Sequence, residues 1–341
     1  MRLVILGASG LVGRTMLRLL EDASWLDDQP LLLTSARSAG RTLPFRGRDL
    51  TCREVTADAF TGVDLALFSA GGDASRRWAP VARDAGAWVV DNSSAWRADP
   101  AAPLVVPEVN GALAPGPDRA PGGGIVANPN CSTIQIALPC AVLDRLAGLR
   151  EVHVTTLQAV SGAGQRGCDD LAAQAAHLAC GERSGAAAAG GTFPRRIAAN
   201  CLPEIGALGD DGFYEEERKV HTELRRILDR ADLAVTCTAT RVPVWNGHAA
   251  AVRAVLAGPV RRDQVVAALA AAPGLLCAPD AGDYLSPAEI SGRCDVHVGR
   301  VRHEPGRDDV VLFWVVADNL LKGAAWNAVQ IARRLATGAL S

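Results

Sequence analysis

The chain has 341 residues, of which 49% are hydrophobic and 21% charged, and its formal net charge is −2. This length suggests about two domains, and the balanced charge offers no broad basic surface for nucleic acid. No apolar run approaches the roughly 18 residues of a membrane span, and the N-terminus does not resemble a signal peptide. Nine cysteines without a C-x-x-C pair argue against a disulfide framework or a zinc site and indicate a cytoplasmic protein.

A strand, a glycine-rich turn and a helix are predicted at the start of the chain. The apolar segment Arg2–Leu6 is followed by Gly7-Ala8-Ser9-Gly10-Leu11-Val12-Gly13, and leucines at helical spacing come next. In this context glycines let the backbone approach a pyrophosphate at the helix N-terminus. The spacing G-x-x-G-x-x-G is one residue longer at its first gap than the usual fingerprint, and an ordinary tight turn is the alternative. We expect this loop to contact a dinucleotide.

The residues after the second strand, Leu31–Thr34, favour NADP over NAD. An NAD-binding protein would typically place an acidic residue there to hold the ribose 2′-hydroxyl. This chain has Ser35-Ala36-Arg37-Ser38 instead, a cation and hydroxyls that suit a 2′-phosphate. The alternative is a solvated turn with incidental arginines.

Strands and helices continue to alternate through the first third of the chain. Strands are expected at Val63–Phe68 and Ala87–Val90, with a helix over Trp78–Ala85 between them. This alternation predicts a parallel, doubly wound sheet. Ligands gather at the carboxyl ends of strands in such sheets, so the polar turns there should border one crevice. Arg97 in one of these turns is a candidate anion clamp, and a solvated surface arginine is the alternative.

The turn Asn128-Pro129-Asn130 precedes an apolar helical segment, which places Cys131 at a loop-to-helix junction. Unpaired N–H groups and the helix dipole favour an anion there, so they should lower the pKa of the Cys131 thiol and make it a nucleophile. The alternative is a small buried hydrophobe, which free cysteine usually is. Because Pro139 lies inside this helix, we expect a kink or an early break.

The second half of the chain contains longer strands rich in Val and Thr, which indicate a different kind of sheet. One of them, beginning at Glu151, leads to Gln158 and to a flexible turn at Ser161-Gly162. Glu216 and Lys219 share one side of a predicted helix and are an ordinary solvated ion pair by default. Further on, polar residues flank bends or precede the closing helix: Arg241, His248 and Asn319. A single His is more often a core or surface residue than a catalyst. The Ala- and Gly-rich composition of Gly181–Gly191 predicts a mobile loop or an insertion.

Taken together, nine segments resemble the aspartate-β-semialdehyde dehydrogenase family across essentially the whole length. They are Gly7–Gly13, Ser35–Gly40, Asp91–Arg97, Val106–Asn110, Asn128–Thr133, Gln158–Gly164, Glu216–Lys219, Arg241–His248 and Asp318–Gly323. Nine segments in the right order are far more specific than a single motif.

The resemblance implies a role for each matched position. Cys131 would be the nucleophile, His248 the acid–base residue, and Gln158 the residue that orients the acyl intermediate. The substrate and phosphate would be held by Asn130, Arg97, Lys219, Arg241 and Glu216. NADP would be held by Gly7, Ser9, Gly10, Leu11, Val12, Gly13, Ser35, Arg37, Ser38, Ser161, Gly162 and Asn319.

The resemblance also implies the reaction and the architecture. Through a cysteine thioester, β-aspartyl phosphate and NADPH would give aspartate-β-semialdehyde and phosphate, reversibly, for lysine, threonine and methionine biosynthesis. A Rossmann-type NADP-binding domain over residues 1–130 would be completed by the helix at 320–341. Residues 131–319 would form an α+β catalytic and dimerisation domain with a mixed sheet, in a homodimer.

Two other functions remain open at this stage. N-acetyl-γ-glutamyl-phosphate reductase shares the chemistry and a related fold, but it typically has Gly-Cys-Tyr-Pro where this chain has Asn130-Cys131-Ser132-Thr133. A silent paralogue could keep the fold and lose catalysis, since fold does not guarantee function. Such a paralogue would lack a reactive, nucleotide-dependent cysteine, so a thiol-reactivity assay would identify it.

Overall fold

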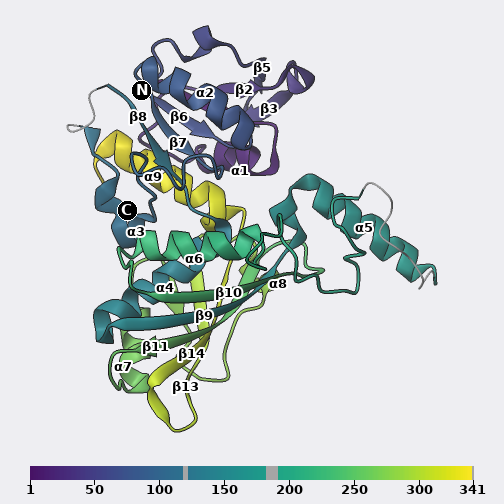
Figure 1. Ribbon diagram of the computed structural model, residues 1–341. Coiled ribbons are helices and arrows are strands. Elements are labelled where there is room, and N and C mark those ends of the chain that lie inside the picture. The colour runs from purple at the N-terminus through teal and green to yellow at the C-terminus, as the bar shows by residue number, and fades with distance from the viewer. Residues whose placement is uncertain (118–121, 182–190, 340–341) are drawn as a thin grey trace. The chain divides into compact units, whose positions relative to one another are not determined.

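The computed structural model describes residues 1–117, 122–181 and 191–339 (Figure 1). The chain divides into two compact units, one joining Met1–Pro129 to Ala324–Ser341 and the other formed by Asn130–Gly323. Each unit contains a sheet of six strands, and the first also carries a two-stranded hairpin. The segment predicted as a mobile loop or an insertion, Gly181–Gly191, lies almost entirely outside the described residues.

The sheet of the first unit is parallel throughout, with the strand order β5-β2-β1-β6-β7-β8. The strands are β1 (Leu3–Leu6), β2 (Leu31–Thr34), β5 (Arg53–Glu54), β6 (Leu65–Phe68), β7 (Trp88–Asp91) and β8 (Gly124–Ala127). The chain begins in the middle of the sheet, moves outward through β2 and β5, and then returns to β6 on the other side of β1. This reversal creates a switch point at the carboxyl ends of β1 and β6, where such sheets bind ligands.

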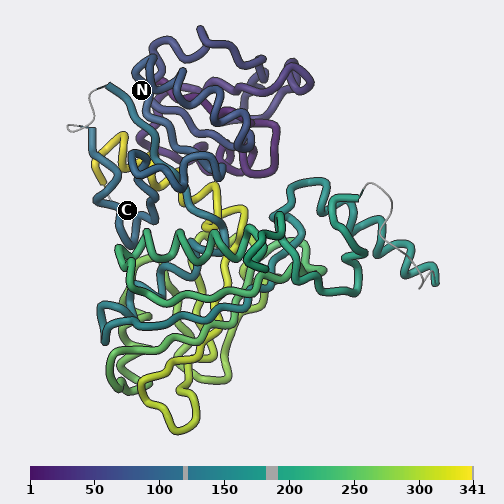
Figure 2. Tube along the Cα trace, in the orientation of Figure 1, coloured from purple at the N-terminus to yellow at the C-terminus, as the bar shows by residue number. Residues whose placement is uncertain are grey.

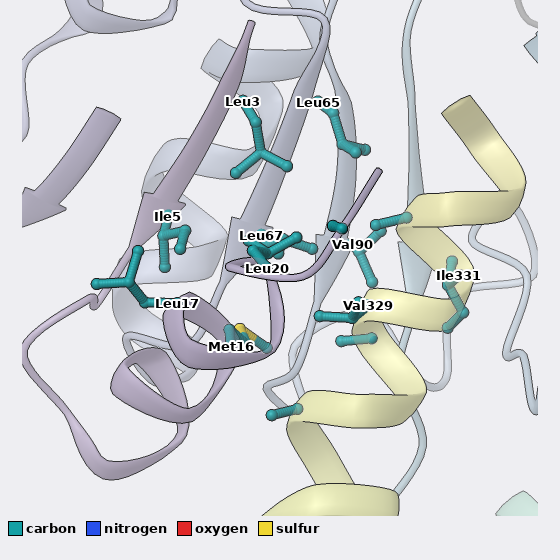
Figure 3. Packing of buried hydrophobic residues seen from close by; sticks show 14 of the residues in the cluster. Leu3, Ile5, Met16, Leu17, Leu20, Leu65, Leu67, Val90, Val329 and Ile331 are labelled. Carbon is teal, nitrogen blue, oxygen red and sulfur yellow. The ribbon is translucent and has the colours of Figure 1, made fainter. Parts of the chain in front are cut away.

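Helices pack on both faces of this sheet, because successive side chains of a strand point in opposite directions. Leu3 and Ile5 belong to the core formed with α1 (Leu11–Leu19) and α9 (Trp326–Thr337), whereas Val4 and Leu6 belong to the core formed with α2 (Gly72–Asp84). Figure 3 shows the first of these cores, with side chains of α1 and α9 meeting those of the strands. The doubly wound, Rossmann-type fold predicted for this region is therefore confirmed.

The remaining elements of the first unit are short. The helices are α1 (Leu11–Leu19), α2 (Gly72–Asp84), α3 (Pro107–Asn110) and α9 (Trp326–Thr337). The described 3₁₀ turns of this unit include η1 (Ala36–Ser38), η2 (Ala57–Phe60) and η3 (Gly111–Leu113). The hairpin consists of β3 (Thr42–Phe45) and β4 (Arg48–Thr51).

The sheet of the second unit is mixed, as predicted, with the strand order β10-β9-β11-β14-β13-β12. Its strands are β9 (Leu149–Gln158), β10 (Ala234–Arg241), β11 (His248–Leu256), β12 (Leu275–Cys277), β13 (Val296–Glu304) and β14 (Arg307–Ala317). Strand β10 is parallel to β9, and β11 is antiparallel to β9. The carboxyl ends of β9 and β10 therefore lie beside the amino end of β11, at the same end of the strands. This places Gln158, Arg241 and His248 together at that end of the sheet.

Helices α4 (Cys131–Ala147) and α6 (Glu215–Ile227) pack against each other and against this sheet, α6 over β10 and α4 over β9 and β11 (Figures 1 and 2). Further helical elements of the unit are η5 (Val160–Ala163), α5 (Gln165–Ala179), α7 (Arg262–Ala270) and α8 (Pro287–Ile290). The π-helical turn η6 (Leu321–Ala325) contains the point at which the chain passes from the second unit to the first. Within the three described ranges, no helix is long and apolar enough to cross a membrane.

We expected a kink or an early break at Pro139. The early break is wrong, because α4 continues through Pro139 to Ala147, and the kink stays a prediction. Proline inside a helix removes one hydrogen bond and costs about 3 kcal/mol. Every residue from Ser132 to Leu143 is buried, however, so packing on all sides holds this segment in place. Burial of the whole segment outweighs the local preference of one residue.

Candidate active site

Cys131 is the first residue of α4, and Asn130 caps the helix. The Oδ1 atom of Asn130 accepts hydrogen bonds from the backbone N–H groups of Ser132 at 3.0 Å and Thr133 at 3.2 Å. The Cys131 side chain is half-buried, whereas Asn130 and Ser132 are buried. The predicted nucleophile thus lies at the positive end of a helix that runs into the core.

A buried carboxylate on α6 connects Asn130 to the end of β9. The Oε1 atom of Glu216 accepts a hydrogen bond from Asn130 Nδ2 at 2.8 Å and another from Gln158 Nε2 at 3.2 Å. Its other oxygen, Oε2, lies 3.5 Å from Nζ of Lys219, which also pairs with Glu215 at 2.8 Å. Glu216 is only 6% exposed, so this is not the solvated ion pair that sequence spacing suggests by default.

Arg241 lies opposite Gln158 in the register of β10 and β9. Its guanidinium is buried, and Nη1 donates a hydrogen bond of 2.9 Å to the carbonyl of Ala159. Burial lowers the pKa of Arg241, while the negative charges of Glu216 and Cys131 act in the opposite direction. Buried guanidinium groups require a compensating anion or hydrogen bonds, so this one is suited to receive an anionic group.

His248 begins β11 and is completely buried. Its Nδ1 atom accepts a hydrogen bond of 3.1 Å from the backbone N–H of Ala159. Because a backbone N–H can only donate, Nδ1 carries no proton, and the neutral ring holds its proton on Nε2. Burial and the nearby charge of Arg241 lower the pKa of His248 well below its ordinary value, which keeps the ring neutral. Among the described residues, Nε2 has no hydrogen-bond partner.

Two glycines leave room at this site. A Cβ atom on Gly162 would lie 2.7 Å from Nη1 of Arg241 and 3.0 Å from Nε2 of His248, so Gly162 lies between these two groups. A Cβ atom on Gly323 would lie 3.1 Å from Cβ of Cys131. The resemblance predicted Gly162 as a cofactor contact, and it gave Gly323 no role.

Two residues predicted to contact the cofactor, Ser161 and Asn319, bind each other. Nδ2 of Asn319 donates to Oγ of Ser161 at 2.9 Å, and its Oδ1 atom accepts from the N–H of Gly247 at 2.9 Å. These bonds fix η5 and the residues after β14 beside the turn that leads to His248. Both side chains are buried.

The first unit contains a separate pocket of about 450 Å³ at the switch point of its sheet. Gly7 has a backbone φ of 88°, and a Cβ there would lie 2.4 Å from the carbonyl oxygen of Ser69. A Cβ on Gly13 would lie 2.2 Å from the carbonyl oxygen of Gly7, so this glycine allows α1 to start close to the turn. The predicted cofactor residues that line the pocket are Gly7, Ser9, Gly10, Ser35, Arg37 and Ser38. Leu11, Val12 and Gly13 form the first turn of α1.

Sequence reasoning missed Arg77, Trp78 and Glu54, which also line this pocket. The guanidinium carbon of Arg77 lies 4.6 Å from the centre of the Trp78 ring. The helix expected from the sequence began at Trp78, whereas α2 begins at Gly72, so Arg77 lay outside the expected helix. Glu54 lies on the short strand β5, which was not predicted.

Arg97 also belongs to the first unit. Its Nε donates to the carbonyl of Asn128 at 2.9 Å and its Nη2 to the carbonyl of Asn92 at 3.3 Å. These carbonyls follow β8 and β7, so the guanidinium is anchored at the carboxyl ends of two strands. Its predicted role in binding phosphate stays a prediction.

Comparison with known proteins shows the two-domain architecture of a semialdehyde dehydrogenase. The family described as "Semialdehyde dehydrogenase, NAD binding domain" matches residues 2–114, and "Semialdehyde dehydrogenase, dimerisation domain" matches residues 141–322. An aspartate-semialdehyde dehydrogenase of Aquifex aeolicus is 41% identical, with 98% of this chain and 97% of that protein aligned. One of Bacillus subtilis is 40% identical with the same coverage. The chain belongs to the aspartate-semialdehyde dehydrogenase family.

Solved structures agree with this assignment. Aspartate semialdehyde dehydrogenase II of Vibrio cholerae complexed with ASA is 40% identical, and it matches with a TM-score of 0.91 over 97% of each chain. An enzyme of Francisella tularensis shares the fold at 22% identity, with a TM-score of 0.84. The chain is therefore an oxidoreductase with a domain for a nicotinamide cofactor.

Proposed function

We propose that this chain reduces β-aspartyl phosphate with NADPH to give aspartate-β-semialdehyde and phosphate, reversibly, for lysine, threonine and methionine biosynthesis. The observation that carries the proposal is the site on the second unit. It combines a thiol on the first turn of α4, a buried guanidinium at Arg241 and a buried neutral imidazole at His248. The Vibrio cholerae relative that binds ASA supports the choice of substrate.

The chemistry in the oxidative direction starts at Cys131. Its thiolate attacks the aldehyde carbon and forms a C–S bond, and the carbonyl oxygen takes the displaced electron pair as an alkoxide. When bound, a nicotinamide cofactor accepts the hydride that leaves this carbon, or returns it in the reverse direction. The resulting thioester of Cys131 is attacked by a phosphate oxygen, the C–S bond breaks, and the thiolate is regenerated while phosphate loses its proton to solvent.

His248 would serve this reaction by donating its Nε2 proton in a hydrogen bond to the developing alkoxide. A donor already in place stabilises charge as it forms, without reorganisation. The resemblance implied an acid–base role, which would require Nε2 to release its proton or Nδ1 to give up its bond from Ala159. Because a thiolate attack produces an alkoxide directly, the donor role balances the reaction without a proton transfer at His248.

Substrate recognition would use the charged groups around the thiol. The planar guanidinium of Arg241 suits a carboxylate, and Glu216 suits the substrate ammonium. Gln158 and Asn130 are held by Glu216, so they would be oriented toward the acyl group. Arg97 and Lys219 would bind the phosphate.

We propose NADP rather than NAD as the cofactor, and the pocket in the first unit supports this choice. The glycine turn leaves space that side chains would fill, and Arg37, Ser38 and Arg77 line the same pocket. Arg37→Ala should raise the KM for NADP+ about tenfold or more and leave the KM for NAD+ nearly unchanged, since a lost charge-assisted bond to phosphate costs about 1.5–3 kcal/mol. Equal increases for both cofactors would contradict a 2′-phosphate site.

We also propose a homodimer, because residues 141–322 match a dimerisation domain. Sedimentation equilibrium at the concentrations used in activity assays should give twice the mass of the 35.5 kDa chain. A monomer that is fully active would contradict this proposal.

The test of the function is phosphate-dependent reduction of NADP+ by aspartate-β-semialdehyde. The wild-type protein should be active, Cys131→Ala should be inactive, and Cys201→Ala, which changes an exposed cysteine, should be active. Activity only with the N-acetyl-glutamate semialdehyde would assign the other reductase. An inactive wild-type protein that still binds NADP would indicate a silent paralogue.

A further inference from the structure

A second acidic residue of α6 contacts the residue before the nucleophile. Glu223 is 4% exposed, and its Oε2 accepts a hydrogen bond of 2.6 Å from the backbone N–H of Asn130. Glu223 lies seven residues after Glu216, two turns along the same face of the helix. Two buried carboxylates of α6 therefore hold one residue, Asn130.

Each polar group of Asn130 makes at least one such contact, and Nδ2 carries a second N–H besides the one that it donates to Glu216. Its carbonyl accepts from Ile134 N–H at 3.0 Å, and its Oδ1 caps α4. Its Nδ2 donates to Glu216, and its backbone N–H donates to Glu223. The first two bonds join Asn130 to the helix that begins at Cys131, and the last two join it to α6.

We propose that Glu223 is a positioning residue for Cys131. Its carboxylate fixes the backbone of Asn130, and through it the direction in which the first turn of α4 presents the thiol. This proposal rests on the function proposed for Cys131 as the nucleophile. An amide buried without its acceptor is unfavourable, so the chain around Asn130 would shift to find another partner if Glu223 were removed. A displacement of about 1 Å at a reacting group is enough to lower turnover by about 10²-fold.

The chain offers a matched control on the same helix. Glu217 is 8% exposed, and its Oε1 accepts from the backbone N–H of Ala239 on β10 at 3.0 Å. It resembles Glu223 in charge, burial and the kind of bond it makes, but its partners are a strand and, through Oε2, the N–H of Tyr214 at the N-cap of α6, and neither is beside Cys131 in the sequence. Glu217→Ala therefore reports the cost of removing a buried carboxylate from α6 without touching Asn130.

The substitutions of Glu223 distinguish the effect of its hydrogen-bond acceptor from the effect of its negative charge. Glu223→Asp keeps the charge but shortens the side chain by about 1.5 Å, one carbon–carbon bond. Glu223→Gln removes the charge but keeps an oxygen at the same reach. Glu223→Ala removes both. For each variant, we would measure kcat, the KM values, the midpoint of thermal unfolding, and the rate at which iodoacetamide alkylates Cys131.

We expect Glu223→Asp and Glu223→Ala to lose about tenfold or more in kcat, with the KM for NADP+ unchanged. Glu223→Gln should stay within about threefold of wild type, and Glu217→Ala should lower the unfolding midpoint while kcat stays near wild type. The alkylation rate of Cys131 should change in the Asp and Ala variants and not in Glu217→Ala.

Three results would overturn the proposal. One is a wild-type kcat in Glu223→Asp, which would exclude the positioning role even if the Ala variant does not fold. Another is an equal loss of kcat in Glu217→Ala, which would indicate a general effect on the unit. The third is a Gln variant as slow as the Ala variant, which would assign the effect to charge. If the wild-type protein does not oxidise the semialdehyde, the proposed function fails, while alkylation of Cys131 still tests the role of Glu223.

Discussion

The imidazole of His248 accepts a hydrogen bond from Ala159, and its proton is therefore on the nitrogen that faces Gly162. A hydrogen-bond donor can be replaced in part by an amide, whereas a base cannot. His248→Gln should therefore keep kcat within about tenfold of wild type, and His248→Ala should lose about 10²- to 10³-fold, as removal of an oxyanion donor does. Equal losses in the two variants would show that His248 must accept a proton.

The same histidine makes folding depend on pH. The unfolded imidazole takes up a proton near pH 6.5, but burial and the charge of Arg241 lower the pKa of His248 well below its ordinary value in the folded protein. The unfolded state then binds more protons, so the free energy of unfolding falls as the pH drops below about 6.5, by at most about 1.4 kcal/mol per unit. Urea unfolding on both sides of this pH should show a smaller decrease in His248→Gln than in wild type. An identical decrease would mean that His248 is protonated in the folded state.

Gly162 separates Arg241 from His248, and a methyl group at this position would contact both. Because the guanidinium is fixed by its bond to Ala159, it cannot move away freely. We expect Gly162→Ala to lower kcat/KM for the semialdehyde about tenfold or more, with a change in the free energy of unfolding of about 1–3 kcal/mol from overpacking. Ser161→Ala, at the neighbouring position, tests the effect of the adjacent hydroxyl. Unchanged kcat/KM in Gly162→Ala would show that the two side chains need not be this close.

Among the elements, the hairpin β3–β4 is attached to the end of α1 by one arginine. The guanidinium of Arg46 donates to the carbonyls of Leu20, Glu21, Ala23 and Leu26 at 2.8–3.2 Å. These carbonyls belong to the turns after α1, where Leu20 and Ala23 also accept from the backbone N–H groups of Ala23 and Leu26, so the cation holds these turns together just beyond the C-terminal end of the helix. Arg46→Met should lower the free energy of unfolding by about 1–3 kcal/mol. Arg48→Met, on the same hairpin, should have little effect, and equal effects would contradict this role of Arg46.

Most elements could be predicted from the sequence because their patterns are local. The alternation of strands and helices gave the doubly wound sheet, and the turn before Cys131 gave the start of α4 at the correct residue. The early break expected at Pro139 was wrong, because burial of the surrounding helix is a property of the tertiary structure. Glu223 was not predicted, because an acidic residue on a helix is ordinary until the rotation of that helix brings it to Asn130. Arg77 was not predicted, because the expected helix began at Trp78 and α2 begins at Gly72.

For the whole molecule, the order of the nine family-like segments along the chain predicted the function better than any single segment did. The predicted catalytic and substrate-binding residues lie up to 117 residues apart in the sequence, from Cys131 to His248. Only the strand order of the mixed sheet brings Gln158, Arg241 and His248 to the same end of the sheet. The resemblance to a family supplied that arrangement in advance. It did not supply the tautomer of His248, which depends on one backbone amide.

The central claim is that Cys131 carries the substrate as a thioester, and a single turnover without phosphate tests it most directly. Enzyme mixed with NADP+ and aspartate-β-semialdehyde should release NADPH in an amount equal to the active sites and then stop. Mass spectrometry of the quenched protein should find the aspartyl group on the peptide that contains Cys131, and added phosphate should remove it. A burst of NADPH with Cys131 unmodified, or with the acyl group on another residue, would contradict the account.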